Sequence, residues 1–310
     1  MKSKRNKTID FTLEEGAHYL KNALKLENLD SPSIEDLTNQ LILGDFFEAI
    51  EIIPDQSIDL LIADPPYNLR KDYHGNIFTE KSQVDYQAFT KRWLEKIKPK
   101  LKENASLYIC CDWQSSLIIG PIIQEHFFIQ NRITWQREKG RGAKRNWKNA
   151  MEDIWFASLS KDYVFHVDAV KTRRQVIAPY RLDGKPKDWE ETKEGNFRMT
   201  HPSNFWDDIT IPFWSMSENT AHPTQKPEKL IAKLILASSN QGDLIFDPFM
   251  GSGTTAVTAK KLDRNYLGIE QNPRYLAWAF KRLAMADQDR RIQGYEDGIF
   301  YERNAQISKK

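Results

Sequence analysis

Short apolar segments alternate with helix-like segments along most of this chain, and this alternation restricts the possible folds more than any other feature. Residues 41–43, 58–63 and 107–111 are almost wholly apolar, as strands buried on both faces of a parallel sheet are. Between the last two, apolar residues at 86, 89, 93 and 97 are spaced as one face of a helix. The pattern predicts βαβ units and therefore an α/β fold with a mostly parallel, twisted sheet flanked by helices.

Composition excludes several other classes of protein. With 310 residues, 40% of them hydrophobic and 28% charged, the chain is typical of one α/β domain with an insertion, and not of a disordered or fibrous protein. The longest nearly apolar run, 117–123, is far shorter than the roughly 20 residues of a membrane span. Cys110 and Cys111 are adjacent, which excludes a disulfide framework and a spaced zinc site. We expect a cytoplasmic protein with no membrane association, no secretory signal and no metal.

The sequence also divides into regions. Residues 1–39 are predicted to be a helical extension, since Ala17, Leu20, Leu24 and Leu26 roughly follow one helical stripe. The strands and helices described above fall within the segment that follows, up to residue 137.

The periodicity weakens between residues 138 and 215. Six of the nine tryptophans lie between positions 135 and 214. We predict an insertion of irregular structure there, richer in basic and aromatic residues than its flanks, with a candidate core strand at 154–156. Regular spacing returns at 216–285, and the last segment, 286–310, is predicted to be a helix or a loose tail.

Any electrostatic signal for nucleic-acid binding has to be local, because 45 basic residues nearly balance 43 acidic ones. One such signal is the segment 137–148, which holds six basic residues and one acidic residue. The basic residues are Arg137, Lys139, Arg141, Lys144, Arg145 and Lys148. Taken alone, this run is equally compatible with a solvated loop.

A motif with potential chemistry, Asp64-Pro65-Pro66-Tyr67, follows an apolar strand, at the sheet edge where α/β proteins bind ligands. The prolines remove two N–H donors and leave carbonyl acceptors beside a carboxylate. Asp64 and the Pro65 carbonyl can therefore accept the two hydrogens of an amino group, while the Tyr67 ring stacks on a flat ring. Taken alone, the motif is also compatible with an ordinary turn.

A second motif, residues 247–255, reads Asp-Pro-Phe-Met-Gly-Ser-Gly-Thr-Thr between a strand and a helix. Glycines allow the backbone to approach a ligand, and the helix start favours negative charge. No lysine follows the last glycine, so this is not a Walker loop, and the third glycine of the dinucleotide fingerprint is absent. Glu270 ends the next strand about 20 residues on, where an acid suits a ribose diol.

Together the two motifs resemble the S-adenosylmethionine-dependent DNA amino-methyltransferases. Their order, with the catalytic motif first and an insertion between, resembles the permuted β class of type II restriction–modification systems. The segments 222–227 (His-Pro-Thr-Gln-Lys-Pro) and 43–46 (Leu-Gly-Asp-Phe) fit the same family, and the resemblance extends from about 41 to 283. It implies a Rossmann-like methyltransferase fold with a catalytic half at 40–137, target recognition within 138–215 and a cofactor half at 216–285.

The resemblance also implies S-adenosyl-L-methionine as cofactor and assigns site residues. The catalytic residues are Asp64, Pro65, Pro66 and Tyr67. The cofactor-binding residues are Asp45, Phe46, Asp64, His222, Pro223, Thr224, Lys226, Asp247, Phe249, Gly251, Ser252, Gly253, Thr254 and Glu270. In this assignment Glu270 holds the ribose hydroxyls, Asp45 holds the cofactor's adenine, and Lys226 helps shape the methionine end.

The implied substrate is double-stranded DNA, with a target adenine flipped out for methylation at N6 and the basic run 137–148 on the DNA phosphates. Asp64 favours adenine N6 over the alternative, cytosine N4. RNA, a protein glutamine and a non-catalytic DNA-binding regulator are further alternatives. Cys110 and Cys111 are interpreted as core residues rather than nucleophiles. The resemblance points to a bacterial or phage-encoded protein paired with a cognate restriction endonuclease, and an orphan methyltransferase is equally compatible with the sequence. A homodimer is compatible with the family.

Overall fold

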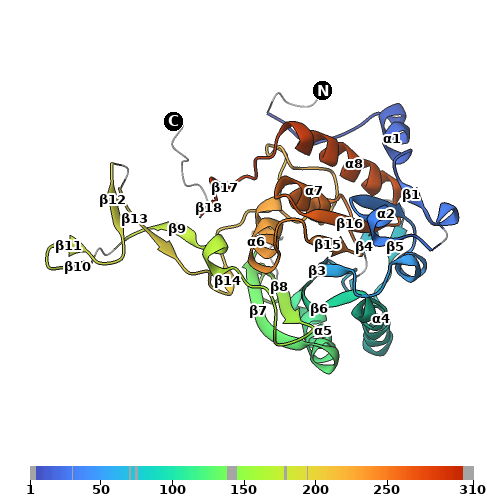
Figure 1. Ribbon diagram of the computed structural model, residues 1–310, viewed down its shortest axis with the longest axis horizontal. Helices are drawn as coiled ribbons and strands as arrows, with labels where there is room; N and C mark the ends of the chain where they lie inside the picture. The colour runs from blue at the N-terminus through green and yellow to red at the C-terminus, as the bar shows by residue number, and fades with distance from the viewer. Residues whose placement is uncertain are drawn as a thin grey trace.

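The computed structural model describes residues 5–29, 31–69, 71–73, 76–137, 145–177, 180–193 and 195–302. Its centre is a nine-stranded sheet flanked by helices (Figure 1). The spatial order is β1 (Leu24–Lys25), β2 (Gln40–Leu43), β16 (Asn265–Glu270), β15 (Leu244–Asp247), β3 (Ile58–Ala63), β6 (Leu101–Cys111), β8 (Met151–Ser158), β7 (Phe128–Gln136) and β14 (Phe205–Trp206). Strand β8 is antiparallel to both its neighbours, and all other neighbours are parallel.

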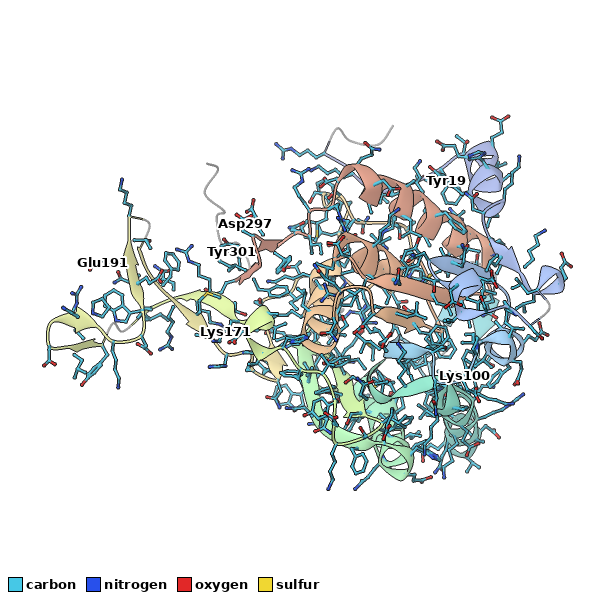
Figure 2. All side chains as sticks on the ribbon, in the orientation of Figure 1. Tyr19, Lys100, Lys171, Glu191, Asp297 and Tyr301 are labelled. Carbon is cyan, nitrogen blue, oxygen red and sulfur yellow. The ribbon has the colours of Figure 1, made fainter. Side chains whose placement is uncertain are left out.

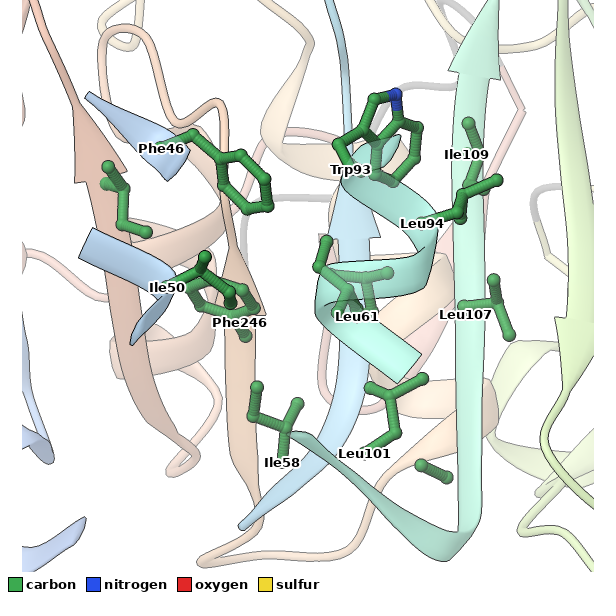
Figure 3. Close-up of a cluster of buried hydrophobic side chains, with 14 of the residues drawn as sticks. Phe46, Ile50, Ile58, Leu61, Trp93, Leu94, Leu101, Leu107, Ile109 and Phe246 are labelled. Atoms are coloured by element: carbon green, nitrogen blue, oxygen red, sulfur yellow. The ribbon is translucent and has the colours of Figure 1, made fainter. Parts of the chain in front are cut away.

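Helices cover both faces of this sheet, which explains why its central strands are apolar throughout. One face packs against α3 (Phe46–Ala49), α4 (Gln83–Ile97) and α5 (Trp113–His126). Figure 3 shows part of this core, with Phe46, Trp93 and Leu107 directed toward a common interior. The other face packs against α6 (Glu228–Ser238), α7 (Thr254–Lys261) and α8 (Pro273–Gln288). Cys110 and Cys111 are buried in these two cores, one on each face.

The amino-terminal region is less helical than predicted. Helix α1 (Leu13–Leu20) begins with a capping box at Thr12 and packs against α8. It ends before Leu24, which instead lies in β1 and pairs in parallel with Ile42 of β2. Leu24 and Leu26 still pack against the core, but from an edge strand and a 3₁₀ turn rather than from a helical stripe. The remaining short elements here are η1 (Leu26–Asn28), α2 (Ile34–Leu37) and η2 (Ile50–Ile52).

We predicted that the insertion would be irregular, and this prediction is wrong. The insertion forms a β-arm that projects from the core (Figure 1). Its sheet has the order β12 (Glu190–Thr192), β13 (Gly195–Thr200), β9 (Thr172–Gln175), β18 (Ile299–Tyr301) and β17 (Tyr295–Glu296), and β10 (Arg181–Leu182) pairs with β11 (Lys185–Pro186) near the tip. Strands β10 to β13 are exposed or half-buried along their length, so they show no apolar alternation in the sequence. Strand β8, around the candidate core strand 154–156, belongs to the central sheet.

The carboxyl-terminal segment contributes to this arm as well. Instead of the predicted helix or tail, β18 pairs with β9 and brings Phe300 into register with Thr172. The other short elements are the β4 (Lys71–Tyr73) and β5 (Asn76–Phe78) hairpin, η3 (Lys98–Lys100) and η4 (Val167–Val170). Within the described ranges, every helix is too short or too polar to cross a lipid bilayer.

Candidate active site

The two sequence motifs meet at the carboxyl ends of the central parallel strands. Tyr67, after β3, and Phe249, after β15, border one cavity of about 400 Å³. Most of the predicted site residues line it: Asp45, Phe46, Asp64, Pro65, Pro66, Tyr67, His222, Thr224, Lys226, Asp247, Phe249, Gly251, Ser252, Thr254 and Glu270. A ligand on the cofactor side therefore shares one space with a ligand at Asp64.

The catalytic motif is held by one hydrogen bond within the motif and by another from helix α4. The Tyr67 hydroxyl donates to Asp64 Oδ1 over 2.7 Å, and the Tyr86 hydroxyl of α4 donates to the Pro66 carbonyl over 3.1 Å. Burial, reinforced by the charges of Asp64 and Glu152, holds the pKa of Tyr67 well above its usual value. The phenol is therefore protonated at neutral pH and donates to Asp64, and this contact orients its ring.

Lys226 lines the same cavity and also contacts the catalytic motif. Its ammonium is at the catalytic motif, where it donates to Asp64 Oδ2 over 2.6 Å and to the Tyr67 oxygen over 3.1 Å. Glu152 Oε2 is 3.3 Å from the same nitrogen. Burial opposes the charge, but the two carboxylates outweigh it and raise the pKa of Lys226 above its usual value, so the side chain stays cationic.

Glu152 is a cavity residue that the sequence analysis missed. It lies near the start of β8, and its side chain is only 4% exposed. The sequence offers one sign of its role, which is its place in a largely apolar segment. Glutamate is rarely buried without a partner, so an acidic residue there suggests a buried ion pair. Its partners besides Lys226 are Tyr67 and Arg137, the second of which we predicted to contact DNA phosphates. The structure places Arg137 at the end of β7 and in the cavity wall, with its guanidinium on Glu152.

The cofactor motif is organised around Glu270 at the end of β16. The backbone N–H groups of Gly251 and Asn272 donate to its two oxygens, each over 2.7 Å. Gly251 has φ of +57°, and a Cβ there would lie 2.9 Å from His222 Nε2, so a larger residue would be strained and would displace His222. Burial raises the pKa of Glu270 to about 7.

Asp247 forms a second buried acid on this side. Its oxygens accept from the Thr255 hydroxyl at 2.5 Å and from the Phe249 N–H at 3.1 Å. Burial raises its pKa to about 7 as well.

Two of the predicted cofactor residues do not line the cavity. Gly253 precedes α7 with φ of +80°, and a Cβ there would lie 2.5 Å from the Cβ of Ala279. This glycine therefore permits α7 to pack closely on α8 rather than to approach a ligand. Pro223 is exposed beside His222, outside the lining.

Aromatic side chains form the opposite wall of the cofactor side. The rings of Phe46 and Phe249 are 5.3 Å apart, and Trp93 packs edge-on against Phe249 at 5.6 Å. Asp45 caps α3, accepting from the Phe47 N–H over 2.8 Å. The cavity suits the expected cofactor in three ways. Phe46 and Phe249 can contact a flat ring system, Glu270 can accept from a diol, and the buried acids suit a cationic group.

The basic run 137–148 connects β7 to β8. Arg145 and Lys148 are exposed, and between them the Trp147 side chain is 92% exposed. The other predicted DNA contacts, Lys139, Arg141 and Lys144, lie outside the described residues.

Comparison with known proteins places the chain in a family. A family model for DNA methylases of the N6/N4 type matches residues 58–281. Type II methyltransferase M.HpaI of Haemophilus parainfluenzae is 33% identical over 80% of this chain and 74% of its own. DNA adenine methyltransferase YhdJ of Escherichia coli (strain K12) is 34% identical over 79% and 83%.

A solved structure supports the same assignment. The crystal structure of the M1.HpyAVI–SAM complex is similar with a TM-score of 0.55 and 26% identity, over 79% of this chain and 98% of its own. The predicted methyltransferase fold is thereby confirmed. With its two motifs facing one cavity, the chain belongs to the DNA methylase family of N6/N4 amino-methyltransferases, as the sequence predicted.

Proposed function

We propose that this protein transfers a methyl group from S-adenosyl-L-methionine to N6 of an adenine in double-stranded DNA. The observation that carries this proposal is the single cavity shared by Asp64 and Glu270, which brings an amino-group acceptor and a cofactor wall together. A relative named as a DNA adenine methyltransferase and a similar structure solved with SAM support the base and the cofactor.

The cofactor supplies an electrophilic methyl group on a positively charged sulfur. In this chain Phe46 and Phe249 form an apolar wall for its adenine, and Asp45 lines the same cavity. Glu270 accepts the ribose hydroxyls, with its oxygens already held by two backbone N–H groups. His222 and Thr224 line the methionine side, where Asp247 contributes a buried carboxyl.

The catalytic residues act on the target amino group. The Asp64 carboxylate and the Pro65 carbonyl accept its two hydrogens, which favours a tetrahedral nitrogen with a free lone pair. Tyr67 stacks on the base while its hydroxyl holds Asp64 in place. Positioning and preorganised acceptors supply most of the rate acceleration.

A base inside a duplex cannot reach this cavity, so the adenine is flipped out at a cost of about a few kcal/mol. Arg145 and Lys148 contact DNA phosphates, and the exposed Trp147 between them adds an aromatic contact surface. The β-arm within 159–215 reads the target sequence. Arg137 lines the cavity, where one nitrogen of its guanidinium is paired with Glu152.

Labelled cofactor distinguishes this function from its alternatives. The protein is incubated with duplex DNA and S-adenosyl-L-methionine carrying a labelled methyl group, and the DNA is then digested to nucleosides. Label in N6-methyladenine is the expected result. Label in N4-methylcytosine would favour the cytosine alternative, and DNA binding without label would favour a non-catalytic regulator.

We further propose that the protein works in the bacterial cytoplasm, where its DNA substrate lies, beside an endonuclease that cuts the same site. The supporting relative is a type II methyltransferase. Sequencing DNA from cells that express the protein identifies the modified site, and challenge of that DNA with the candidate endonuclease tests the pairing. Light scattering of the purified protein tests whether it forms a homodimer.

A further inference from the structure

Two carboxylates share one ammonium group at the inner end of the cavity. Lys226 Nζ lies 2.6 Å from Asp64 Oδ2 and 3.3 Å from Glu152 Oε2. The Tyr67 hydroxyl also bridges the two acids, at 2.7 Å from Asp64 Oδ1 and 3.3 Å from Glu152 Oε2. Glu152 therefore contacts both groups that hold Asp64.

Nothing in the methyl transfer described so far uses Glu152, although its burial is costly. A carboxylate that is 4% exposed requires compensation by paired charges and hydrogen bonds. Arg137 holds its Oε1, while Lys226 and Tyr67 approach its Oε2. The Arg137 N–H also bonds the Ala150 carbonyl over 2.7 Å, which closes the β7–β8 connection beside this pair. Glu152 is thus fixed from two sides and faces Lys226.

This arrangement affects how strongly Asp64 can grip an amino group. An ammonium paired with Asp64 alone would draw its negative charge toward Lys226 and weaken it as a hydrogen-bond acceptor. A second carboxylate competes for the same ammonium and restores that charge for the substrate. We propose that Glu152 is a positioning residue for the methyl transfer, which shares Lys226 and Tyr67 with Asp64 and so keeps Asp64 able to accept a hydrogen from the target amino group. The proposal rests on the function proposed above.

Glu152→Gln tests this role, because it removes the charge and keeps the shape. We expect single-turnover methyl transfer to slow by about tenfold or more, by analogy with lost electrostatic contacts in other active sites. The dissociation constant for S-adenosyl-L-methionine and the KM for DNA should stay within about threefold of the wild type, since the proposed role of Glu152 acts on Asp64 through Lys226 and Tyr67. Glu152→Asp keeps the charge and should recover part of the rate.

Asp153→Asn is the matched control. It makes the same carboxylate-to-amide change one residue further along β8, on the opposite face, where Asp153 accepts from Thr134. Its transfer rate should equal that of the wild type within about twofold. Melting temperatures of all variants separate lost stability from lost rate.

A double-mutant cycle with Lys226→Met gives a second test. Without the ammonium, Glu152 shares only the Tyr67 hydroxyl with Asp64, so adding Glu152→Gln to Lys226→Met should slow transfer far less than it slows the wild type. This double variant leaves no charge imbalance in the cluster and covers the case in which Glu152→Gln alone fails to fold. Independent, multiplying effects would overturn the proposal.

Two other results would also overturn it: a Glu152→Gln enzyme as fast as the wild type, or one that loses cofactor affinity and stability together with rate. Failure of this inference can be distinguished from failure of the proposed function by the behaviour of the wild-type protein. If the wild-type protein itself transfers no label to DNA, the methyltransferase assignment fails and this inference fails with it.

Discussion

Lys226 and Asp64 are 162 positions apart in sequence, yet their charged groups meet at 2.6 Å. At the scale of residues, the site is defined by such pairings and by how deeply they are buried. Asp64 sits between Tyr67 and Lys226, whereas Glu270 sits between two backbone N–H groups. The first carboxylate faces the target base and the second faces the cofactor, so their substitution should have different kinetic effects.

Asp64→Ala removes the acceptor for the target amino group. Turnover should fall by at least about 10², because a preorganised electrostatic contact to the reacting group is lost. Cofactor binding, measured by calorimetry, should survive. Loss of cofactor affinity with little further effect on the rate would mean that Asp64 has been given the wrong role.

The pH dependence of cofactor binding should report on Glu270. Burial raises its pKa to about 7, so below that pH the free protein carries a protonated carboxyl there. The ionised form is the better acceptor for ribose hydroxyls, so binding releases a proton and affinity falls as pH drops below 7, by up to about tenfold per pH unit.

Titration calorimetry between pH 5.5 and 8 measures this dependence. Asp247, whose pKa is also raised to about 7 by burial, can add to it, so Glu270→Gln is the necessary comparison. That variant should bind the cofactor more weakly and with a flatter pH profile. An unchanged profile would assign the titration to another group.

At the scale of elements, loops at the strand ends and between β7 and β8 carry the specialised geometry. The turn from β15 into α7 needs left-handed backbone at Gly251 and Gly253. The connection from β7 to β8 places exposed cations next to the cavity wall. Each loop can be altered while the sheet beneath it stays intact.

Gly251→Ala should disturb the cofactor side specifically. Its φ of +57° costs a non-glycine residue about 1–2 kcal/mol, and the new Cβ would force His222 away. We expect a lower melting temperature and at least about tenfold weaker cofactor binding. Gly242→Ala is the control, since it has φ of +82° and nothing within 4 Å. Gly242→Ala should lower the melting temperature about as much as Gly251→Ala does, and it should leave the cofactor affinity unchanged.

Replacing Arg145 and Lys148 with alanine should weaken DNA binding. The slope of log affinity against log salt should flatten by about 0.9 for each lost phosphate contact, as measured by fluorescence anisotropy. Lys21→Ala with Lys25→Ala, at the opposite edge of the central sheet, is the charge-matched control. Equal slopes for both double variants would make this loop an ordinary solvated surface.

At the scale of the whole molecule, a compact α/β body carries the cavity. Figure 2 shows the β-arm extending away from this body. Contacts at the tip of the arm are local, such as the bond from Trp189 Nε1 to the Tyr180 carbonyl. Strands β9 and β13 are hydrogen-bonded at the base of this tip, where Val176 donates to Asn196. The body therefore does not depend on the tip for its packing.

A chain in which a short turn replaces residues 177–194 should fold and bind the cofactor like the wild type. It should lose site-specific methylation, because the proposed recognition surface is gone while the cavity remains. Sequencing of methylated DNA, calorimetry with the cofactor and the melting temperature measure these three properties. Unaltered site specificity would move target recognition to another part of the chain.

The α/β fold and both motifs could be predicted from the sequence because their signals are local. Strands buried on two faces are apolar throughout, and the residues from Asp64 to Tyr67 and from Asp247 to Thr255 follow such strands directly. That locality also explains the errors: the stripe from Ala17 to Leu26 suggested one long helix, although Leu24 forms an edge strand.

Only the tertiary structure decided the rest. Glu152 and Lys226 reach Asp64 from separate elements, and no spacing in the sequence records that approach. The arm likewise depends on β18 pairing with β9 across more than a hundred residues, in strands of three and four residues that are too short to show a period. Buried local patterns determined the framework of this protein, whereas long-range contacts between charged and polar groups, which leave no periodic trace, decided how its active site is arranged.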